Sequence, residues 1–202
     1  MITTLTESEV DKLRTASRVM YRISYDRIKS DLCRPDVASK FRGQKIIDLG
    51  SGTGWYLPLF FKAGCKELVV VEPKPRQELV DKIGEMNSQG QRVFLERDAY
   101  NFWNKHPDES AIVTSYGVFD PVIIGGCRSI LIDDSDLDEI IDKYFRTAAK
   151  EIERITPTGQ ITVHRGPLAY LIKEYTTKLQ PYSEDGTHTD WRESDGGILL
   201  KQ

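Results

Sequence analysis

A short loop rich in glycine limits what this chain can fold into more than any other stretch of its sequence. The segment from Ile46 to Trp55 reads IIDLGSGTGW, so an apolar run enters a loop with glycine at every second position, Gly50, Gly52 and Gly54. Glycine adopts positive φ without strain and lets a ligand lie against bare backbone. A helix that begins just after such a loop offers unpaired backbone N–H groups. The segment therefore predicts a strand, a ligand-holding loop and a helix.

Two common nucleotide-binding loops do not fit this segment. A dinucleotide loop reads G-x-G-x-x-G, and counted from Gly50 its last glycine falls on Trp55. A P-loop ends in G-K-S or G-K-T, and no such sequence follows Gly54. What remains is an acidic residue, Asp48, two positions before the first of three alternating glycines.

Short β-branched runs alternate with helical stretches through most of the chain. Five such runs predict strands near residues 46–47, 68–71, 93–95, 111–113 and 161–163. They are apolar without alternation, as is typical of strands that are covered on both faces. Alternating strands and helices imply right-handed crossovers and a mostly parallel sheet. We therefore expect a doubly wound α/β protein.

The apolar spacing at the amino terminus predicts an amphipathic helix over the first thirty residues, with Thr6 and Glu9 as a capping box at its start. A further turn or two of helix is expected from Val37 to Phe41, before Gly43. We therefore divide the chain into an N-terminal helical cap, residues 1–42, and a main domain, residues 43–202.

The carboxyl-terminal third has the clearest helical pattern. A helix is predicted from Ser135 to Ile155, because apolar residues recur at helical spacing and Pro157 and Gly159 follow. A second helix is predicted through residues 168–179. Residues 187–191 and 197–200 are expected to pair as a terminal hairpin.

The segment DLGSGTG, residues 48–54, resembles the first motif of class I S-adenosylmethionine-dependent methyltransferases. That resemblance implies a Rossmann-like, seven-stranded, mostly parallel sheet with helices on both faces. It also implies S-adenosyl-L-methionine as the cofactor. The residues of this motif that the resemblance assigns to cofactor binding are Asp48, Gly50, Ser51, Gly52 and Gly54.

Later segments extend the resemblance to about residues 43–165. Glu72 ends the second strand, where the family typically places an acid on the ribose hydroxyls, and two hydroxyl donors suit one carboxylate. Asp98 and Ala99 resemble the third motif, whose acid typically accepts from the adenine amino group. Ser115 lies in the region that resembles the fourth motif, beside the methyl group. These four residues are also predicted to bind the cofactor.

The fourth strand has two candidate positions. Residues 119–124 are an alternative to 111–114, because family members often place a Phe-Asp pair at the start of this strand. We prefer 111–114, since Pro121 would remove a hydrogen bond from a central strand. The choice decides whether residues 114–116 or 125–127 face the methyl group.

The resemblance implies chemistry that needs little from the protein. A sulfonium already activates its methyl group, so the protein mainly aligns a nucleophile and excludes water. A general base is needed only if the acceptor is protonated at working pH. Tyr116 and His164 are the nearest candidates for that base, and no metal is expected.

We expect a methyltransferase that acts on an acceptor still to be identified, in our interpretation a small molecule. A non-catalytic S-adenosylmethionine-binding or scaffold protein is the alternative, and it leaves a protein partner open. Aminopropyl transfer on the same fold is a weaker alternative. Enzymes of that kind usually carry several acids near the fourth strand, where this chain has only Asp120.

Net charge and composition limit which binding partners and which cellular compartment we expect. The chain of 202 residues carries 28 basic and 31 acidic side chains, a net charge of −3, which leaves little room for a basic docking surface for nucleic acid. It has three cysteines without a C-x-x-C pair, no basic and apolar leader, and no run of membrane-spanning length. We therefore expect a cytoplasmic protein without a membrane partner.

Overall fold

The computed structural model describes residues 6–16, 25–116, 135–165, 170–182 and 196–202. Its helices are α1 (Glu7–Ala16), α2 (Tyr25–Leu32), α3 (Pro35–Phe41), α4 (Leu57–Lys62), α5 (Gln77–Ser88), the 3₁₀ helix η1 (Phe102–Lys105), α7 (Ser135–Ile155) and α8 (Tyr170–Glu174). Its strands are β1 (Lys45–Leu49), β2 (Glu67–Val71), β3 (Val93–Glu96), β4 (Ile112–Tyr116), β5 (Ile161–Arg165), β6 (Leu179–Pro181) and β7 (Gly196–Lys201). The α/β prediction is confirmed.

The strands form one seven-stranded sheet in the order β3-β2-β1-β4-β5-β7-β6. The first five strands are parallel, and β7 runs antiparallel to both β5 and β6. The chain leaves β1 toward β2 on one side and returns to β4 on the other. Ligands of open α/β sheets bind at such a switch point, outside the carboxyl ends of the strands. The glycine loop follows β1 at this point.

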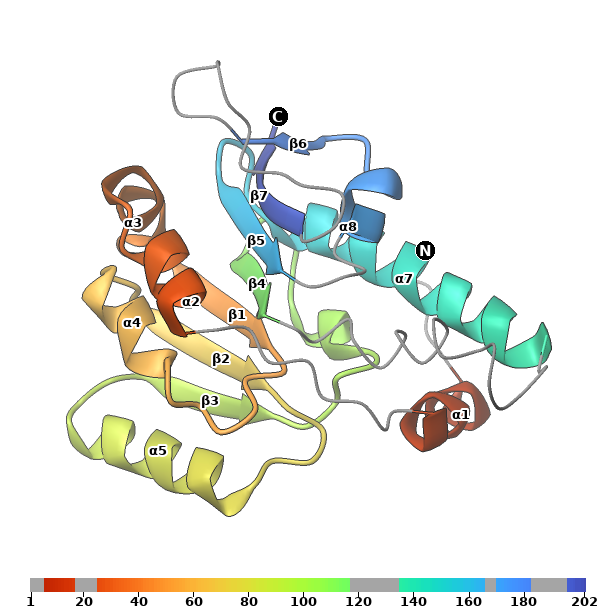
Figure 1. Ribbon diagram of the computed structural model, residues 1–202, viewed down its shortest axis with the longest axis horizontal. Coiled ribbons are helices and arrows are strands. Elements are labelled where there is room, and N and C mark those ends of the chain that lie inside the picture. The colour runs from red at the N-terminus through yellow and green to blue at the C-terminus, as the bar shows by residue number, and fades with distance from the viewer. Residues whose placement is uncertain (1–5, 17–24, 117–134, 166–169, 183–195) are drawn as a thin grey trace.

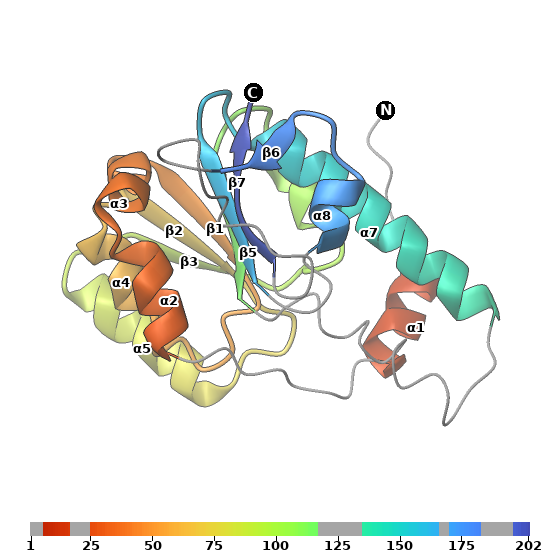
Figure 2. The ribbon, with the colours of Figure 1, turned by 45° about the horizontal axis from the view of Figure 1, so that its top comes forward.

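Helices cover both faces of the sheet (Figures 1 and 2): α2 to α5 lie on one face, and α1, α7 and α8 lie on the other. Alternate strand residues point into two separate cores, so that Ile46 and Leu68 enter the first and Ile47 and Val69 the second. Burial on both faces explains why the strands are apolar without alternation. No helix in the described part of the chain combines the length and apolar character that crossing a bilayer requires.

The amino-terminal prediction is confirmed in part. Thr6 and Glu9 form the capping box, since the Thr6 N–H donates to the Glu9 carboxylate at 2.7 Å and the Glu9 N–H donates to Thr6 Oγ1 at 3.3 Å. One continuous helix over thirty residues is wrong, because α1 and α2 pack on opposite faces of the sheet (Figure 2). An ion pair of 2.6 Å between Lys143 and Glu9 joins α1 to α7. The domain boundary after residue 42 stays a prediction.

The carboxyl-terminal predictions also need correction. The long helix α7 is confirmed, but α8 ends at Glu174, and Leu179 begins β6 because it pairs with Lys201 of β7. In the described residues, β7 pairs with β5 and β6, and the expected hairpin partner, residues 187–191, lies outside them. Strand β4 confirms the preferred position of the fourth strand. The alternative, residues 119–124, and the third cysteine, Cys127, lie outside the described residues.

Strand β3 forms one edge of the sheet, and a side chain of α5 bonds the outward-facing backbone groups of its first residue, Val93. The N–H groups of Leu68 and Glu72 donate to the carbonyl groups of residues 92 and 96, so the backbone of the alternate residue Val93 faces away from β2. There the Asn87 amide of α5 donates to the Val93 carbonyl at 3.0 Å and accepts from the Val93 N–H at 2.9 Å. Both hydrogen-bonding groups of Val93 are thereby satisfied within the chain.

Candidate functional site

The glycine loop leaves the carboxyl end of β1 with Gly50, Gly52 and Gly54 at φ of +67°, +59° and +73°. Side chains rarely tolerate this conformation. The two later glycines have different surroundings. A Cβ at Gly52 would meet nothing within 4 Å, whereas one at Gly54 would lie 2.5 Å from Leu79 Cδ1 and 3.1 Å from Leu57 Cδ1. Gly52 therefore borders open space, and Gly54 lets α4 and α5 pack closely beneath the loop.

Glu72 follows β2 and lies against this loop. The Gly52 N–H donates to Glu72 Oε2 at 3.4 Å, and the Lys74 N–H donates to Oε1 at the same distance. Both contacts are long, so the carboxylate keeps capacity to accept stronger hydrogen bonds. Burial raises the pKa of Glu72. The structure thus brings together two residues that the sequence predicts to hold the cofactor.

Asp98 and Ala99 follow β3, the next strand outward at the same edge of the sheet. The Asn101 N–H donates to Asp98 Oδ1 at 3.0 Å and fixes a tight turn there. The Tyr144 hydroxyl of α7 donates to the Ala99 carbonyl at 3.4 Å. The turn therefore has a defined shape, and its predicted role at the adenine ring stays a prediction.

Asp48 is fully buried beneath the loop and accepts three hydrogen bonds from hydroxyl groups. Tyr56 donates to Oδ2 at 2.7 Å, Thr114 donates to Oδ1 at 2.8 Å, and Ser51 also donates to Oδ2. We call Ser51, Tyr56 and Thr114 the hydroxyl clamp. It joins β1 to the glycine loop, to the start of α4 and to β4. Sequence reasoning expected Asp48 and Ser51 at the ligand, but it missed Tyr56 and the contact of Thr114 with Asp48.

The clamp leaves Asp48 without a cationic partner. Burial raises the pKa of Asp48 to about 6, the three hydroxyl groups oppose that rise, and the nearby charge of Glu72 adds to it. Among the described residues, no lysine, arginine or histidine forms an ion pair with it. A carboxylate with this pKa is still ionised in neutral and mildly basic solution.

Ser115 and His164 meet on the opposite face of the sheet. Ser115 Oγ lies 2.8 Å from His164 Nδ1, and His164 Nε2 contacts Thr162 Oγ1. The Thr162 hydroxyl donates its only proton to the Val113 carbonyl at 2.5 Å, so it accepts from Nε2–H. Nδ1 of the neutral ring is then the acceptor, and Ser115 donates to it. Ser115 thus lies in a buried network, and its predicted contact with the cofactor stays a prediction.

Neither predicted base has the environment that proton abstraction requires. His164 is fully buried, and burial lowers its pKa to about 3. The Tyr116 hydroxyl is also buried, has no hydrogen-bond partner among the described residues, and burial raises its pKa well above the usual value. A histidine with this pKa is a weak base, and its Nδ1 is already occupied by Ser115. The structure therefore offers no exposed base at these two positions.

A buried ion pair joins the amino-terminal region to the end of β5, and sequence reasoning missed it. Arg165 donates from Nε and Nη2 to the two oxygens of Asp31 at 2.9 and 2.8 Å, and both side chains are nearly inaccessible. The pair fixes α2 over the carboxyl ends of β4 and β5. The charges of Asp31 and Asp48 both act on Tyr116 between them.

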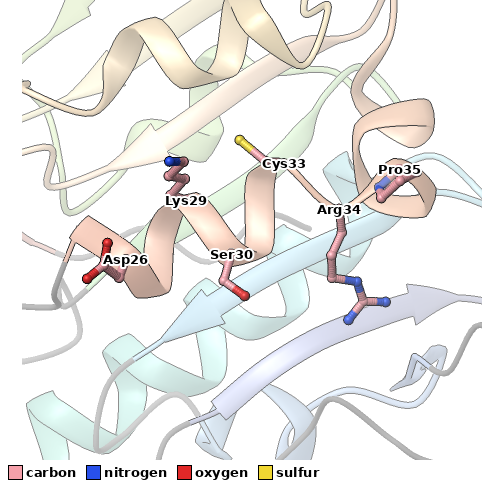
Figure 3. Close-up of a pocket in the computed structure, with 6 residues that line it drawn as sticks. All are labelled: Asp26, Lys29, Ser30, Cys33, Arg34 and Pro35. Atoms are coloured by element: carbon pink, nitrogen blue, oxygen red, sulfur yellow. The ribbon is translucent and has the colours of Figure 1, made fainter.

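The outer surface of α2 bears a shallow hollow of about 420 Å³, and it contains none of the predicted cofactor residues (Figure 3). Its polar side chains do not converge, because Lys29 and Cys33 point to one side of the helix and Ser30 and Arg34 to the other. Arg34 is moreover paired with Asp36. This hollow therefore lacks the convergent polar groups of a ligand site.

The sheet order, the helices on both faces and the loop after β1 define the class I methyltransferase fold. The chain is similar to the N-methyltransferase NodS from Bradyrhizobium japonicum, solved with S-adenosyl-L-homocysteine: 12% identity, TM-score 0.57, with 96% of this chain and 97% of that chain covered. It is also similar to a protein from Methanococcus maripaludis described as a candidate S-adenosyl-L-methionine-dependent methyltransferase: 15% identity, TM-score 0.50, with 92% and 97% covered. No protein-family model and no curated protein sequence matches the chain.

Proposed function

We propose that this protein is an S-adenosyl-L-methionine-dependent methyltransferase whose acceptor is a small molecule. One observation carries the proposal: Glu72 Oε2 lies 3.4 Å from the backbone nitrogen of Gly52. Gly52 belongs to a loop that has three glycines with positive φ and lies at the switch point of the sheet. The fold shared with NodS, whose structure contains S-adenosyl-L-homocysteine, supports the same cofactor here. The net charge of −3 favours a small acceptor over a nucleic acid.

Each described residue of the site has a defined part in this proposal. The open space above Gly52 would admit the cofactor against bare backbone, and Glu72 would accept from its ribose hydroxyls. Asp98 would accept from the adenine amino group. When bound, the cofactor supplies a methyl group that its sulfonium already activates. The protein then orients the acceptor and excludes water.

Calorimetric titration with S-adenosyl-L-methionine and S-adenosyl-L-homocysteine tests the proposal. We expect both to bind to the wild-type protein, and Gly52→Leu to abolish binding because it fills the open space above the loop. Gly90→Leu is the matched control, since Gly90 also has a positive φ of 82° and open space around it but lies after α5, away from the loop. Absence of binding to folded wild-type protein would refute the proposal.

A non-catalytic S-adenosylmethionine-binding protein is the second candidate, and the burial of Tyr116 and His164 favours it. A methyltransferase without a base is restricted to acceptors that are already nucleophilic at working pH. Screening a panel of amines, thiols and phenols for homocysteine release separates the two candidates. Turnover of any acceptor supports the enzyme, and tight binding without turnover on all of them supports the binding protein.

A further inference from the structure

We infer that Asp48 gives the site a preference for the cationic, methyl-loaded cofactor over its neutral product. The inference rests on the proposed function. Asp48 acts through its charge and without touching the ligand, because its carboxylate is fully buried and held by the hydroxyl clamp. It is therefore a specificity-determining residue of the site and not a catalytic one.

Asp48 has no counter-charge among the described residues. Three hydroxyl groups satisfy the hydrogen-bonding capacity of Asp48, but hydroxyl groups carry no net charge. The nearby buried ion pair is different, since Arg165 neutralises Asp31. Glu72, the other carboxylate beside the loop, adds a second negative charge that also raises the pKa of Asp48. Arg76 acts on Glu72 and lowers its pKa, whereas no described cation does so for Asp48. The carboxylate of Asp48 is thus a buried negative charge without a described cationic partner.

The cofactor and its product differ in charge. S-adenosyl-L-methionine and S-adenosyl-L-homocysteine share their adenosine, ammonium and carboxylate groups, and they differ by one methyl group and one positive charge on sulfur. Methyl transfer removes that charge, because the electrons of the S–CH₃ bond return to sulfur as the acceptor takes the methyl group. A buried negative charge is weakly screened and stabilises the sulfonium but not the thioether. The same charge therefore favours loading with cofactor and release of product.

Asp48 lies directly beneath the glycine loop. It lies two residues before the first glycine of the loop, and the Ser51 hydroxyl of the loop itself donates to it. The clamp holds the carboxylate in one place through β4 and the start of α4, so the field at the loop is fixed before a ligand arrives. Such preorganised charge costs no rearrangement when the ligand binds.

The test measures the dissociation constants of three probes: S-adenosyl-L-methionine, S-adenosyl-L-homocysteine and sinefungin, which carries an ammonium group in place of the methylsulfonium. Titrations are run at pH 8, where Asp48 is ionised, on the wild-type protein and on Asp48→Asn. We expect the substitution to weaken binding of the two cationic probes, relative to binding of the thioether, on the order of tenfold. This is the size of effect that one unit charge has on a nearby cation inside a protein. Sinefungin separates charge from the bulk of the methyl group.

Thr114→Val is the matched control, because it removes one hydrogen bond of the clamp and keeps the charge of Asp48. We expect it to weaken all three probes by a similar factor and to leave their ratios unchanged. The inference is overturned if the ratio of the dissociation constants of cation and thioether changes less than twofold in Asp48→Asn. It is also overturned if Thr114→Val changes that ratio as much as Asp48→Asn does. If the wild-type protein binds none of the probes, the proposed function itself fails. Should Asp48→Asn not fold, Asp48→Glu, which keeps the charge, must retain the wild-type ratios.

Discussion

Asp48 and His164 are two fully buried titratable side chains that contact hydroxyl groups on opposite faces of the same sheet. Burial opposes charge on both, but it moves their pKa values in opposite directions, up to about 6 for Asp48 and down to about 3 for His164. Near pH 8 the carboxylate is therefore charged and the imidazole is neutral. Burial leaves the imidazole on one face uncharged, whereas three hydroxyl groups limit the rise in the pKa of the carboxylate on the other face, which therefore stays charged.

The polar groups around Asp48 and around His164 also differ in the direction of their hydrogen bonds. The hydroxyl clamp contains only donors toward Asp48, so it favours the charged form of the carboxylate. In the other network, Thr162 accepts from His164 and Ser115 donates to it, an arrangement that suits only one neutral tautomer. The first cluster can influence a cationic ligand, and the second holds β4 and β5 together.

The largest expected effect comes from removing the carboxylate itself. Asp48→Ala leaves three buried hydroxyl groups without their acceptor, and we expect the free energy of unfolding to fall by about 3 kcal/mol or more. Urea denaturation followed by circular dichroism measures the loss. Asp48→Asn keeps the volume and one acceptor oxygen, so it should lose about half as much. A loss below about 1 kcal/mol for Asp48→Ala would show that the clamp contributes little to stability.

The glycine loop next to Asp48 gives the second effect. Gly54→Ala forces a Cβ against Leu79 and also adopts a positive φ, so we expect a loss of about 2 to 3 kcal/mol. Gly52→Ala carries only the backbone strain, about 1 kcal/mol, because its Cβ meets open space. Thermal denaturation of the two variants measures the difference. Equal losses would contradict the packing described for Gly54.

Acid titration compares the two buried groups directly. Burial lowers the pKa of His164 from its ordinary 6.5 to about 3. As the pH drops below 6.5, His164 is protonated in the unfolded chain but not in the folded chain, so the free energy of unfolding decreases. His106, whose pKa burial lowers to about 4, acts in the same direction, and Asp48 opposes both between its ordinary 3.8 and about 6.

We expect His164→Asn to reduce the slope of stability against pH by up to about 1.4 kcal/mol per pH unit between pH 6.5 and about 3. Urea titrations at half-unit pH intervals measure this slope. His106→Asn serves as the comparison, because it should reduce the slope over the narrower window from pH 6.5 to about 4 that its pKa allows. An unchanged slope in both variants would contradict burial of the neutral rings.

The smallest effect comes from a pair of tyrosines whose rings are in contact, with centroids 5.7 Å apart. Tyr56→Phe removes a hydrogen bond to Asp48 and should cost about 1 to 2 kcal/mol. Tyr116→Phe removes a hydroxyl that has no partner among the described residues, so stability should change by less than about 0.5 kcal/mol. Chemical denaturation of both variants measures the two losses of unfolding free energy. A larger loss in Tyr116→Phe would reveal a hydrogen bond to that hydroxyl.

Local patterns made much of the fold predictable from the sequence. The capping box of Thr6 and Glu9 lies within one turn, and the strand, glycine loop and helix from Ile46 onward lie within a few residues of each other. Pro121 favoured residues 111–114 over residues 119–124 as the fourth strand, because proline lacks an N–H, and β4 confirms that preference. Leu179 was misplaced, because helical spacing cannot show that this residue pairs with Lys201, in a strand much later in the chain.

The missed parts of the site depend on contacts between distant residues. Thr114 reaches Asp48 across 66 positions, and Arg165 reaches Asp31 across 134. The first contact follows from the register of β1 and β4, and the second from the packing of α2 near the end of β5. Local periodicity carries neither. Burial of His164 was also hidden, because all five residues of β5 are buried and the strand shows no alternation between an inner and an outer face. Hydroxyl residues near a strand end are the one sequence signal that could have suggested the clamp.

Asn87 has a consequence for how copies of this protein meet. Because its amide occupies both hydrogen-bonding groups of Val93, a second chain cannot extend the sheet there without first displacing that side chain. The exposed edge strand of an open sheet is a common starting point for aggregation and fibre growth. Here the Asn87 side chain, on a helix that covers the sheet, blocks this edge at Val93, far from the loop that the proposed chemistry uses.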